Sequence, residues 1–450
     1  MSTGSGIDIP TQDDESTQER LRRQIAYCVR TPFYRELFET HSIDPGAIRT
    51  LEDVRQMPVL VTPDIHRQAQ EATVERDGHP FGTFLAAPLD DVISVSSTSG
   101  TTGMPTLYAF TAHDVEVTDK LWQRALRFVG VRPGDCVLQG FGLSMYLAGL
   151  PLVRALERMG ARPVPIGAEA GAEKLLRMAR LVRPRVLACT PSYAEHLLER
   201  VEDVLGMQPR DLGIEIIVCA GEPGAGLPEV RRKLQDGWGA QVYDMLGGAH
   251  GIMNASCGHP EYQGMHVLGM DYSVSTHLVD PITKEPLDVV DGVIGERVKT
   301  SIEWEAQPPL RYSVGDTYQV FTQPCPCGRA GLRVKVLGRV DDLLIVKGVK
   351  IYPAAVKNLI NSFIPEATGE MRILLEQKPP RVIPPLRLRV EYRAGLGAEE
   401  QERLRSNIVA AMHSRLTIRP EVDLVPAGTL PRTEKKQQLI EVSAQPSGRG

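Results

Sequence analysis

Residues 92–106 read Val-Ile-Ser-Val-Ser-Ser-Thr-Ser-Gly-Thr-Thr-Gly-Met-Pro-Thr and are the most informative stretch of this 450-residue chain. Residues 91–96 predict a β-strand because apolar and polar side chains alternate along them. The glycines and hydroxyls that follow predict a loop whose backbone N–H groups and side chains bind phosphate oxygens. No Gly-Lys-Ser/Thr triplet is present, so the loop is not a Walker motif. The bare pattern also fits a flexible surface loop.

Strand-like and helix-like segments alternate downstream of this loop. The predicted strands cover residues 135–139, 162–165, 186–189, 215–219 and 241–244. The predicted helices cover residues 112–129, 147–159, 172–180, 194–205 and 229–238. This order predicts an α/β domain with a mostly parallel, doubly wound sheet and helices on both of its faces.

The two ends of the chain have a different organisation. Before the loop, residues 19–39 predict two short helices, the second starting at Thr31-Pro32. After about Gly264, short strands joined by turns predict a β-rich subdomain over residues 257–337. We therefore expect a large N-terminal domain with mixed sheets (residues 1–338), a polar hinge (339–342) and a small α+β domain (343–450).

Composition excludes several classes of function. The net charge of −5 comes without a basic stripe, which argues against a nucleic-acid partner. No signal peptide and no run of about 18 apolar residues is recognisable, so we expect no membrane contact and a cytoplasmic location. Cys28, Cys136, Cys189 and Cys219 stand alone in apolar surroundings and are expected to be small buried side chains.

The loop resembles the phosphate-binding segment of the adenylate-forming (ANL) superfamily, Ser-Ser/Thr-Gly-Thr-Thr-Gly-x-Pro-Thr. The lysine that usually precedes the proline in this family is replaced by Met104. The resemblance implies that ATP binds through Ser97, Thr98, Ser99, Gly100, Thr101, Thr102 and Gly103.

Further segments follow in the family's order. Ala220-Gly221-Glu222-Pro223 is similar to the adenine-binding turn, and residues 311–316 (RYSVGD) are similar to the segment whose aspartate, here Asp316, binds the ribose hydroxyls. Residues 338–342 (GRVDD) resemble the hinge, in which Arg339 contacts the nucleotide and Asp341 is the pivot of a mobile C-terminal domain.

The segment Leu430-Pro-Arg-Thr-Glu-Lys-Lys436 resembles the family's C-terminal catalytic motif. The resemblance makes Lys436 the catalytic lysine, which with Arg339 stabilises charge at the α-phosphate. Lys435 stands where the family has glycine.

Residues 31–35, 190–193 and 347–353 are similar to the phenylacetate–CoA ligase branch of the superfamily. This implies ATP-dependent activation of an aromatic carboxylic acid to an acyl-adenylate, followed by transfer to CoA. The acid pocket is expected near Tyr146, Gly149, Ala220, Gly247, Gly248 and His250.

The main departure is the segment Tyr243–His250 (YDMLGGAH), which we expect to be a loop. The family has Tyr-Gly-x-Ser/Thr-Glu, so Tyr243 and Asp244 are expected beside the nucleotide, and Gly247 replaces the glutamate that binds Mg²⁺. Mg²⁺ prefers oxygen ligands. Three explanations stay open: replacement by Asp244 or water, a loop reshaped for an unusual acyl group, and weak adenylation.

Three cysteines form a separate pattern. Cys325-Pro-Cys327 and the upstream Cys257, together with His266 or alternatively His259, match a closed tetrahedral Zn²⁺ site. Four protein ligands leave no open position, so we expect a structural site; unbound reduced cysteines are the alternative.

Two further functions remain open. One is an enzyme that passes the acyl group to an amine instead of CoA. The other is a catalytically degenerate protein that binds nucleotide or acyl groups, suggested by Gly247. A homodimer is also open.

Overall fold

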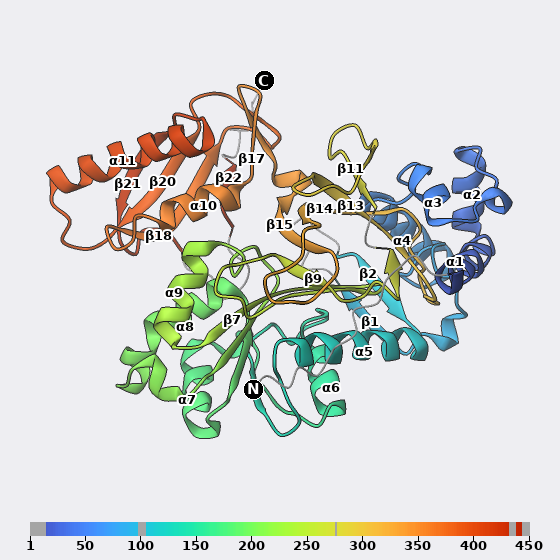
Figure 1. Ribbon diagram of the computed structural model, residues 1–450, viewed down its shortest axis with the longest axis horizontal. Helices are drawn as coiled ribbons and strands as arrows, with labels where there is room; N and C mark the ends of the chain where they lie inside the picture. The colour runs from blue at the N-terminus through green and yellow to red at the C-terminus, as the bar shows by residue number, and fades with distance from the viewer. Residues whose placement is uncertain (1–14, 98–104, 275–276, 432–437, 443–450) are drawn as a thin grey trace.

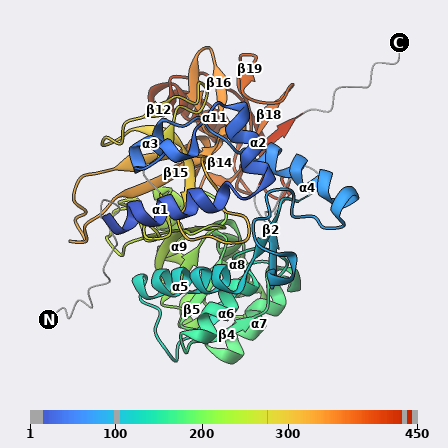
Figure 2. The ribbon, with the colours of Figure 1, turned by 90° about the vertical axis from the view of Figure 1, so that its right-hand side faces the viewer.

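The computed structural model describes residues 15–97, 105–274, 277–431 and 438–442. Four helices come first, and the predicted helix start at Thr31-Pro32 is confirmed: the Thr31 side chain accepts a hydrogen bond from the Tyr34 N–H, and proline occupies the first helical position. In Figure 2 these helices lie nearest the viewer. They are α1 (Glu15–Cys28), α2 (Pro32–Thr40), α3 (Leu51–Gln56) and α4 (Pro63–Asp77).

The predicted parallel sheet is confirmed. Its strands lie in the order β4-β3-β5-β6-β7 and run parallel. The strands are β3 (Cys136–Gln139), β4 (Arg162–Pro165), β5 (Val186–Cys189), β6 (Ile216–Cys219) and β7 (Gln241–Gly248). One apolar cluster joins the sheet to α5 (Ala112–Phe128) and α6 (Leu150–Arg158). A second cluster on the other face joins it to α7 (Ala172–Val182), α8 (Pro191–Leu205) and α9 (Pro228–Trp238).

The predicted β-rich region continues this sheet rather than forming a separate one. Strand β7 pairs with β6 through its first half and with β8 through its second half, so it joins the two regions. The continuation runs β8-β9-β15-β14-β13-β11-β12, with β10 beside β13. Its strands are β8 (Ile252–Ser256), β9 (Met265–Val267), β10 (Ser273–Val274), β11 (Leu278–Val279), β12 (Pro286–Leu287), β13 (Ile294–Ser301), β14 (Tyr312–Phe321) and β15 (Arg333–Arg339).

One expectation was wrong at this junction. The strand predicted over residues 241–244 does not end there: Met245–Gly248, expected to be part of a loop, extend β7 and pair with β8. The glycines at the end of the segment suggested a loop, yet Gly247 pairs with Met253 and Gly248 with Ile252. The turn is confined to Ala249–Gly251.

A two-stranded hairpin precedes the parallel sheet. Strand β1 (Ser94–Ser97) pairs antiparallel with β2 (Leu107–Phe110), and Ser96 lies opposite Tyr108. Strand β1 starts later than predicted because residues 89–91 form a 3₁₀ turn. The connection between the two strands is the predicted phosphate loop, of which Thr98–Met104 fall outside the described residues.

The small C-terminal α+β domain is confirmed. A 3₁₀ turn (Val340–Asp342) follows β15, and two sheets are packed with two helices around one apolar cluster. The elements are β16 (Leu344–Val346), β17 (Val349–Ile351), α10 (Pro353–Asn361), β18 (Ala367–Leu375), β19 (Arg381–Val382), β20 (Arg387–Tyr392), α11 (Ala398–Leu416), β21 (Glu421–Pro426) and β22 (Ile440–Val442). Strands β17, β18, β19 and β22 were not predicted.

The C-terminal domain lies against α9 and β15 of the large domain (Figure 1). The Glu229 N–H at the start of α9 donates to the Asn358 side-chain oxygen on α10, at 3.5 Å. Among the described residues, no helix is both long and apolar enough to cross a membrane.

Burial of the isolated cysteines is mostly as expected. Cys28, Cys189 and Cys219 are buried. Cys136, the first residue of β3, is only half-buried.

Candidate active site

The predicted phosphate loop leaves β1 at a buried residue. The Ser97 N–H donates to the Met145 carbonyl oxygen at 2.7 Å, and Ser97 pairs with Tyr146 in an isolated bridge. Tyr146 therefore lies beside the entrance of the phosphate loop. Gly149 lies in the same segment. Only glycine fits there, because a Cβ would lie 2.7 Å from the Gly142 carbonyl oxygen.

The predicted adenine turn follows β6 directly. Its Glu222 side chain accepts a hydrogen bond from the Ser192 N–H at 2.8 Å, which fixes the turn against the start of α8. Gly221 has φ 92°, a left-handed conformation that glycine adopts without strain. Ala220 is buried, whereas Gly221 is exposed and Pro223 is half-buried.

The pairing of β6 with β7 shows which residues lie beside this turn. Cys219, the last residue of β6, lies opposite Asp244. Ala220 and Gly221 therefore lie beyond Tyr243, at the level of Met245 and Leu246. The Tyr243 side chain packs against the apolar cluster on the α5 side. Its hydroxyl lies close to Gly258, where a Cβ would be only 3.1 Å away. The same cluster includes Ala220 of the turn, and the predicted contact of Tyr243 with the nucleotide stays a prediction.

Asp244 points to a different, buried environment. Its Oδ2 accepts a hydrogen bond from the Tyr262 hydroxyl at 2.6 Å, and its backbone N–H donates to the Ser256 Oγ at 2.8 Å. Burial raises the pKa of Asp244 to about 6. This carboxyl is therefore held by the protein beside the adenine turn.

Three predicted polar residues meet at the start of the C-terminal domain. Asp316 on β14 lies opposite Arg339 on β15. One guanidinium nitrogen of Arg339 is 3.5 Å from Asp316 Oδ1, and the other is 3.2 Å from Asp341 Oδ2. Arg339 packs over Gly315, where a Cβ would lie only 2.6 Å from the guanidinium. Asp341 is exposed in the turn that leads to the small domain.

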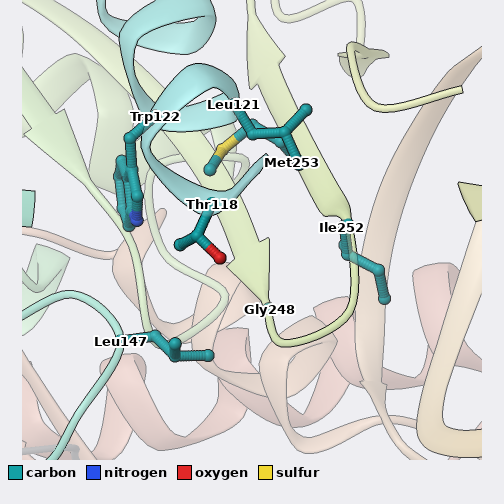
Figure 3. Close-up of a pocket in the computed structure, with 8 residues that line it drawn as sticks. Thr118, Leu121, Trp122, Leu147, Gly248, Ile252 and Met253 are labelled. Atoms are coloured by element: carbon teal, nitrogen blue, oxygen red, sulfur yellow. The ribbon is translucent and has the colours of Figure 1, made fainter. Parts of the chain in front are cut away.

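A small cavity lies between α5 and the β7–β8 hairpin (Figure 3). Its volume of about 10 Å³ is close to that of one water molecule. Of the predicted acid-pocket residues, Gly248 lines it, and a Cβ at Gly247 would meet Met253 at 3.3 Å. Its lining residues are Thr118, Leu121, Trp122, Leu147, Gly248, Gly251, Ile252 and Met253.

His250 lies outside the lining of this cavity. It is fully buried on the turn after β7, with φ 68°. Its ring makes edge contacts with Tyr108 and Trp304 at centroid distances of 5.2 and 5.3 Å. Burial holds the pKa of His250 well below its ordinary value, so the imidazole is neutral at pH 7.

Lys299 on β13 lies beneath the same turn and was not predicted. It is 4% exposed, and its ammonium donates to the Ala249 carbonyl oxygen at 3.4 Å. The ammonium also lies 4.7 Å from the centre of the Tyr312 ring. Burial, and then the neighbouring Arg297, lower the pKa of Lys299 from 10.5 to about 7.

The structure brings the predicted metal ligands together. One ligand atom from each of Cys257, His266, Cys325 and Cys327 lies within 4.8 Å of all the others. The Cys257 and Cys325 sulfurs are 3.8 Å apart, and Cys327 Sγ is 3.5 Å from His266 Nε2. His259 is not part of this group; its Nδ1 instead contacts the backbone of Glu261.

Lys435 and Lys436 fall outside the described residues, as do Thr98, Ser99, Gly100, Thr101, Thr102 and Gly103. Their predicted roles stay predictions. Leu430, at the start of the predicted catalytic motif, is buried.

Comparison with known proteins decides the family. Residues 348–441 match the AMP-binding enzyme C-terminal domain. The chain is 32% identical over 438 residues to the phenylacetate–coenzyme A ligase of Thermus thermophilus, covering 93% of each chain. The chain belongs to the phenylacetate–CoA ligase family. The chain is also 27% identical to the phenylacetate–coenzyme A ligase of Escherichia coli. This match covers 93% of this chain and 92% of that protein.

Solved structures agree with this family. The chain matches 2-hydroxyisobutyryl-CoA ligase in its postadenylation state with a TM-score of 0.85 at 28% identity, covering 96% of this chain and 89% of that one. The thioesterification state of the same ligase gives a TM-score of only 0.67 at 29% identity. The domain arrangement here therefore resembles the postadenylation state. The protein is an adenylate-forming acid–thiol ligase, which activates an acid with ATP and transfers it to CoA.

The sequence missed the cavity wall and Lys299 for different reasons. Trp122 and Thr118 come from α5, which carries no motif and is recognisable only as a helix. Lys299 lies in a predicted strand but carries no motif, and its burial, with that of all residues from Gly295 to Ser301, is visible only in the structure.

Proposed function

We propose that the nucleotide binds between the Ala220–Pro223 turn and the junction of the two domains, with its ribose at Asp316. The observation that carries this is the pairing of Asp316 with Arg339 and of Arg339 with Asp341. A carboxylate oriented by a guanidinium can accept hydrogen bonds from ribose hydroxyls. Arg339, at the last residue of β15, then contacts the nucleotide directly.

The reaction has two steps. A carboxylate oxygen of the acid attacks the α-phosphorus of ATP, forming the acyl-adenylate and releasing pyrophosphate. The CoA thiol then attacks the acyl carbon, and AMP leaves with that carboxylate oxygen. Lys436 stabilises charge in the first step. Rotation of the small domain about Asp341 removes Lys436 and admits CoA. The two states of 2-hydroxyisobutyryl-CoA ligase support such a rotation. This chain matches the postadenylation state with a TM-score of 0.85 and the thioesterification state with one of 0.67.

An aromatic acid of the phenylacetate type is the first candidate substrate, because the curated relatives are phenylacetate–CoA ligases. A short branched acid is the second candidate. The solved relative 2-hydroxyisobutyryl-CoA ligase suggests it, and a short acid needs less movement of the wall of the water-sized cavity beside Gly248 than a ring does. The tail of either acid packs against Gly248, and its carboxylate points to the phosphate loop.

We also propose that Cys257, His266, Cys325 and Cys327 bind a structural Zn²⁺. Two sulfurs at about 2.3 Å from a tetrahedral zinc stand roughly 3.8 Å apart, and a sulfur and a nitrogen roughly 3.6 Å apart. The observed separations of 3.8 and 3.5 Å fit these values. Burial lowers the pKa of His266 to about 4, which keeps the ring neutral as a metal ligand must be. The zinc would tie β8 and β9 to the turn between β14 and β15.

Pyrophosphate release measured against a panel of acids tests this function. Release is expected only when ATP and a suitable acid are both present, and mass spectrometry should find the acyl-CoA once CoA is added. Phenylacetate, benzoate and 2-hydroxyisobutyrate separate the two candidate classes. Product formed only when an amine replaces CoA, or no release with any acid, would contradict the proposal.

A further inference from the structure

The last residues of β7, Met245–Gly248, carry no carboxylate that could bind Mg²⁺. Resemblance to the family places an acidic residue in this segment, and two alignments are possible. If Tyr243 matches the motif tyrosine, its glutamate becomes Gly247. If Gly247 matches the motif glycine, which agrees better with the position of Leu246 beside the adenine turn, the glutamate becomes His250. Neither residue supplies the carboxylate oxygen that Mg²⁺ prefers.

The described residues at this position instead form a buried cluster of two basic side chains, Lys299 and His250. Lys299 lies under the turn, bound through its ammonium to the Ala249 carbonyl and to the Tyr312 ring. No carboxylate in the described part of the chain forms an ion pair with it. Burying an ammonium without a counter-ion is unfavourable, which indicates that the partner of Lys299 is an anionic ligand.

His250 gives a second, independent indication. It is fully buried, and neither ring nitrogen has a hydrogen-bond partner within the described residues. Buried polar groups are nearly always satisfied in folded proteins. The turn itself is held firmly, because the Ser301 hydroxyl donates to the His250 carbonyl oxygen at 2.7 Å. A bound ligand that accepts the imidazole N–H would complete this arrangement.

The location points to the phosphate chain of ATP. The ring of Tyr108 contacts His250, and Tyr108 lies on β2 just after the predicted phosphate loop. On the other side, Lys299 lies opposite Tyr312, which begins the strand that carries Asp316. The Lys299–His250 cluster thus lies between the segments predicted to bind the phosphates and the ribose.

We propose that Lys299 and His250 form a built-in anion site for the β- and γ-phosphates of ATP, in place of a Mg²⁺ held by the protein. This inference rests on the proposed nucleotide site. Lys299 supplies the positive charge and His250 a neutral N–H donor, and both are present before the nucleotide arrives. The released pyrophosphate is bound by the same groups.

Titration calorimetry with pyrophosphate and with AMP tests the proposal. Lys299→Met should weaken pyrophosphate binding by about 10- to 100-fold, because it removes a charged hydrogen bond, and should leave AMP affinity unchanged. Lys284→Met is the matched control, since Lys284 lies in the same sheet region but is paired with Glu296 and partly exposed. Equal pyrophosphate affinity in Lys299→Met and the wild type would overturn the proposal.

The wild-type protein gives a second readout that does not depend on the variant folding. Replacing Mg²⁺ with EDTA should weaken its pyrophosphate affinity by less than about tenfold. Loss of pyrophosphate binding in EDTA, with AMP binding retained, would overturn the anion site alone. Failure of AMP to bind at all would instead contradict the proposed nucleotide site.

Discussion

Replacing Lys299 with methionine is expected to stabilise the ligand-free protein at pH 7, although it weakens phosphate binding. Methionine has a similar length and leaves no buried charge. The pKa of Lys299 falls from 10.5 to about 7 in the folded chain. The unfolded chain therefore binds more protons between these values, and the free energy of unfolding rises with pH across this window.

The size of the effect follows from the same two pKa values. Burying this side chain costs about 4 kcal/mol at pH 7 and about 2 kcal/mol at pH 9, where the cost is that of deprotonating the amine. Methionine loses the contact with the Tyr312 ring and the hydrogen bond to Ala249, together worth about 1–2 kcal/mol. The expected net gain is about 2–3 kcal/mol at pH 7 and close to zero at pH 9.

Thermal unfolding followed by circular dichroism at pH 7 and pH 9 measures this gain. A domain of this size gains roughly 2 °C per kcal/mol, so Lys299→Met should melt about 4–6 °C higher than the wild type at pH 7. The difference should nearly vanish at pH 9, and Lys284→Met should show no such dependence. A variant that melts lower than the wild type at pH 7, or a difference equal at both pH values, would refute the reasoning.

Three further predictions concern the metal, the pocket and the catalytic lysine. Purified protein should contain about one zinc per chain. The Cys325→Ser variant should lose this zinc and the control variant Cys136→Ser should keep it. Folded wild-type protein without zinc would contradict the proposed metal site. Leu147→Ala should raise the ratio of kcat/KM for a larger acid to kcat/KM for a smaller acid by about tenfold or more. Acyl-CoA formation with the two acids measures this ratio, and an unchanged ratio would show that the acid binds elsewhere. Lys436→Ala should lower the rate of adenylation by at least about 100-fold while thioester formation from preformed adenylate is retained, and full adenylation by this variant would contradict the assignment.

Much of the fold could be predicted because local patterns dominate it. Alternating strands and helices predicted the parallel sheet and its two helical layers, and Thr31-Pro32 marked a helix start through capping chemistry. The union of the two sheet regions could not be predicted. It depends on β7 being long enough to pair with both β6 and β8, whereas its glycines suggested a loop.

The site was predicted unevenly for similar reasons. Asp316 and Arg339 carry motifs, and the structure places them opposite each other. The position of Tyr243 could not be read from the sequence, since it depends on the register between β6 and β7. Lys299 carries no motif, and only its burial in the sheet distinguishes it from a surface lysine. Zinc binding, a cytoplasmic location and the oligomeric state stay predictions.

The most direct test of the central claim follows oxygen from the acid into AMP. The acid is labelled with ¹⁸O in its carboxylate and incubated with the protein, ATP and CoA, and the products are examined by mass spectrometry. Formation of an acyl-adenylate predicts one ¹⁸O atom in the phosphate of AMP and none in pyrophosphate. Label in inorganic phosphate together with ADP, or unlabelled AMP beside acyl-CoA, would contradict it.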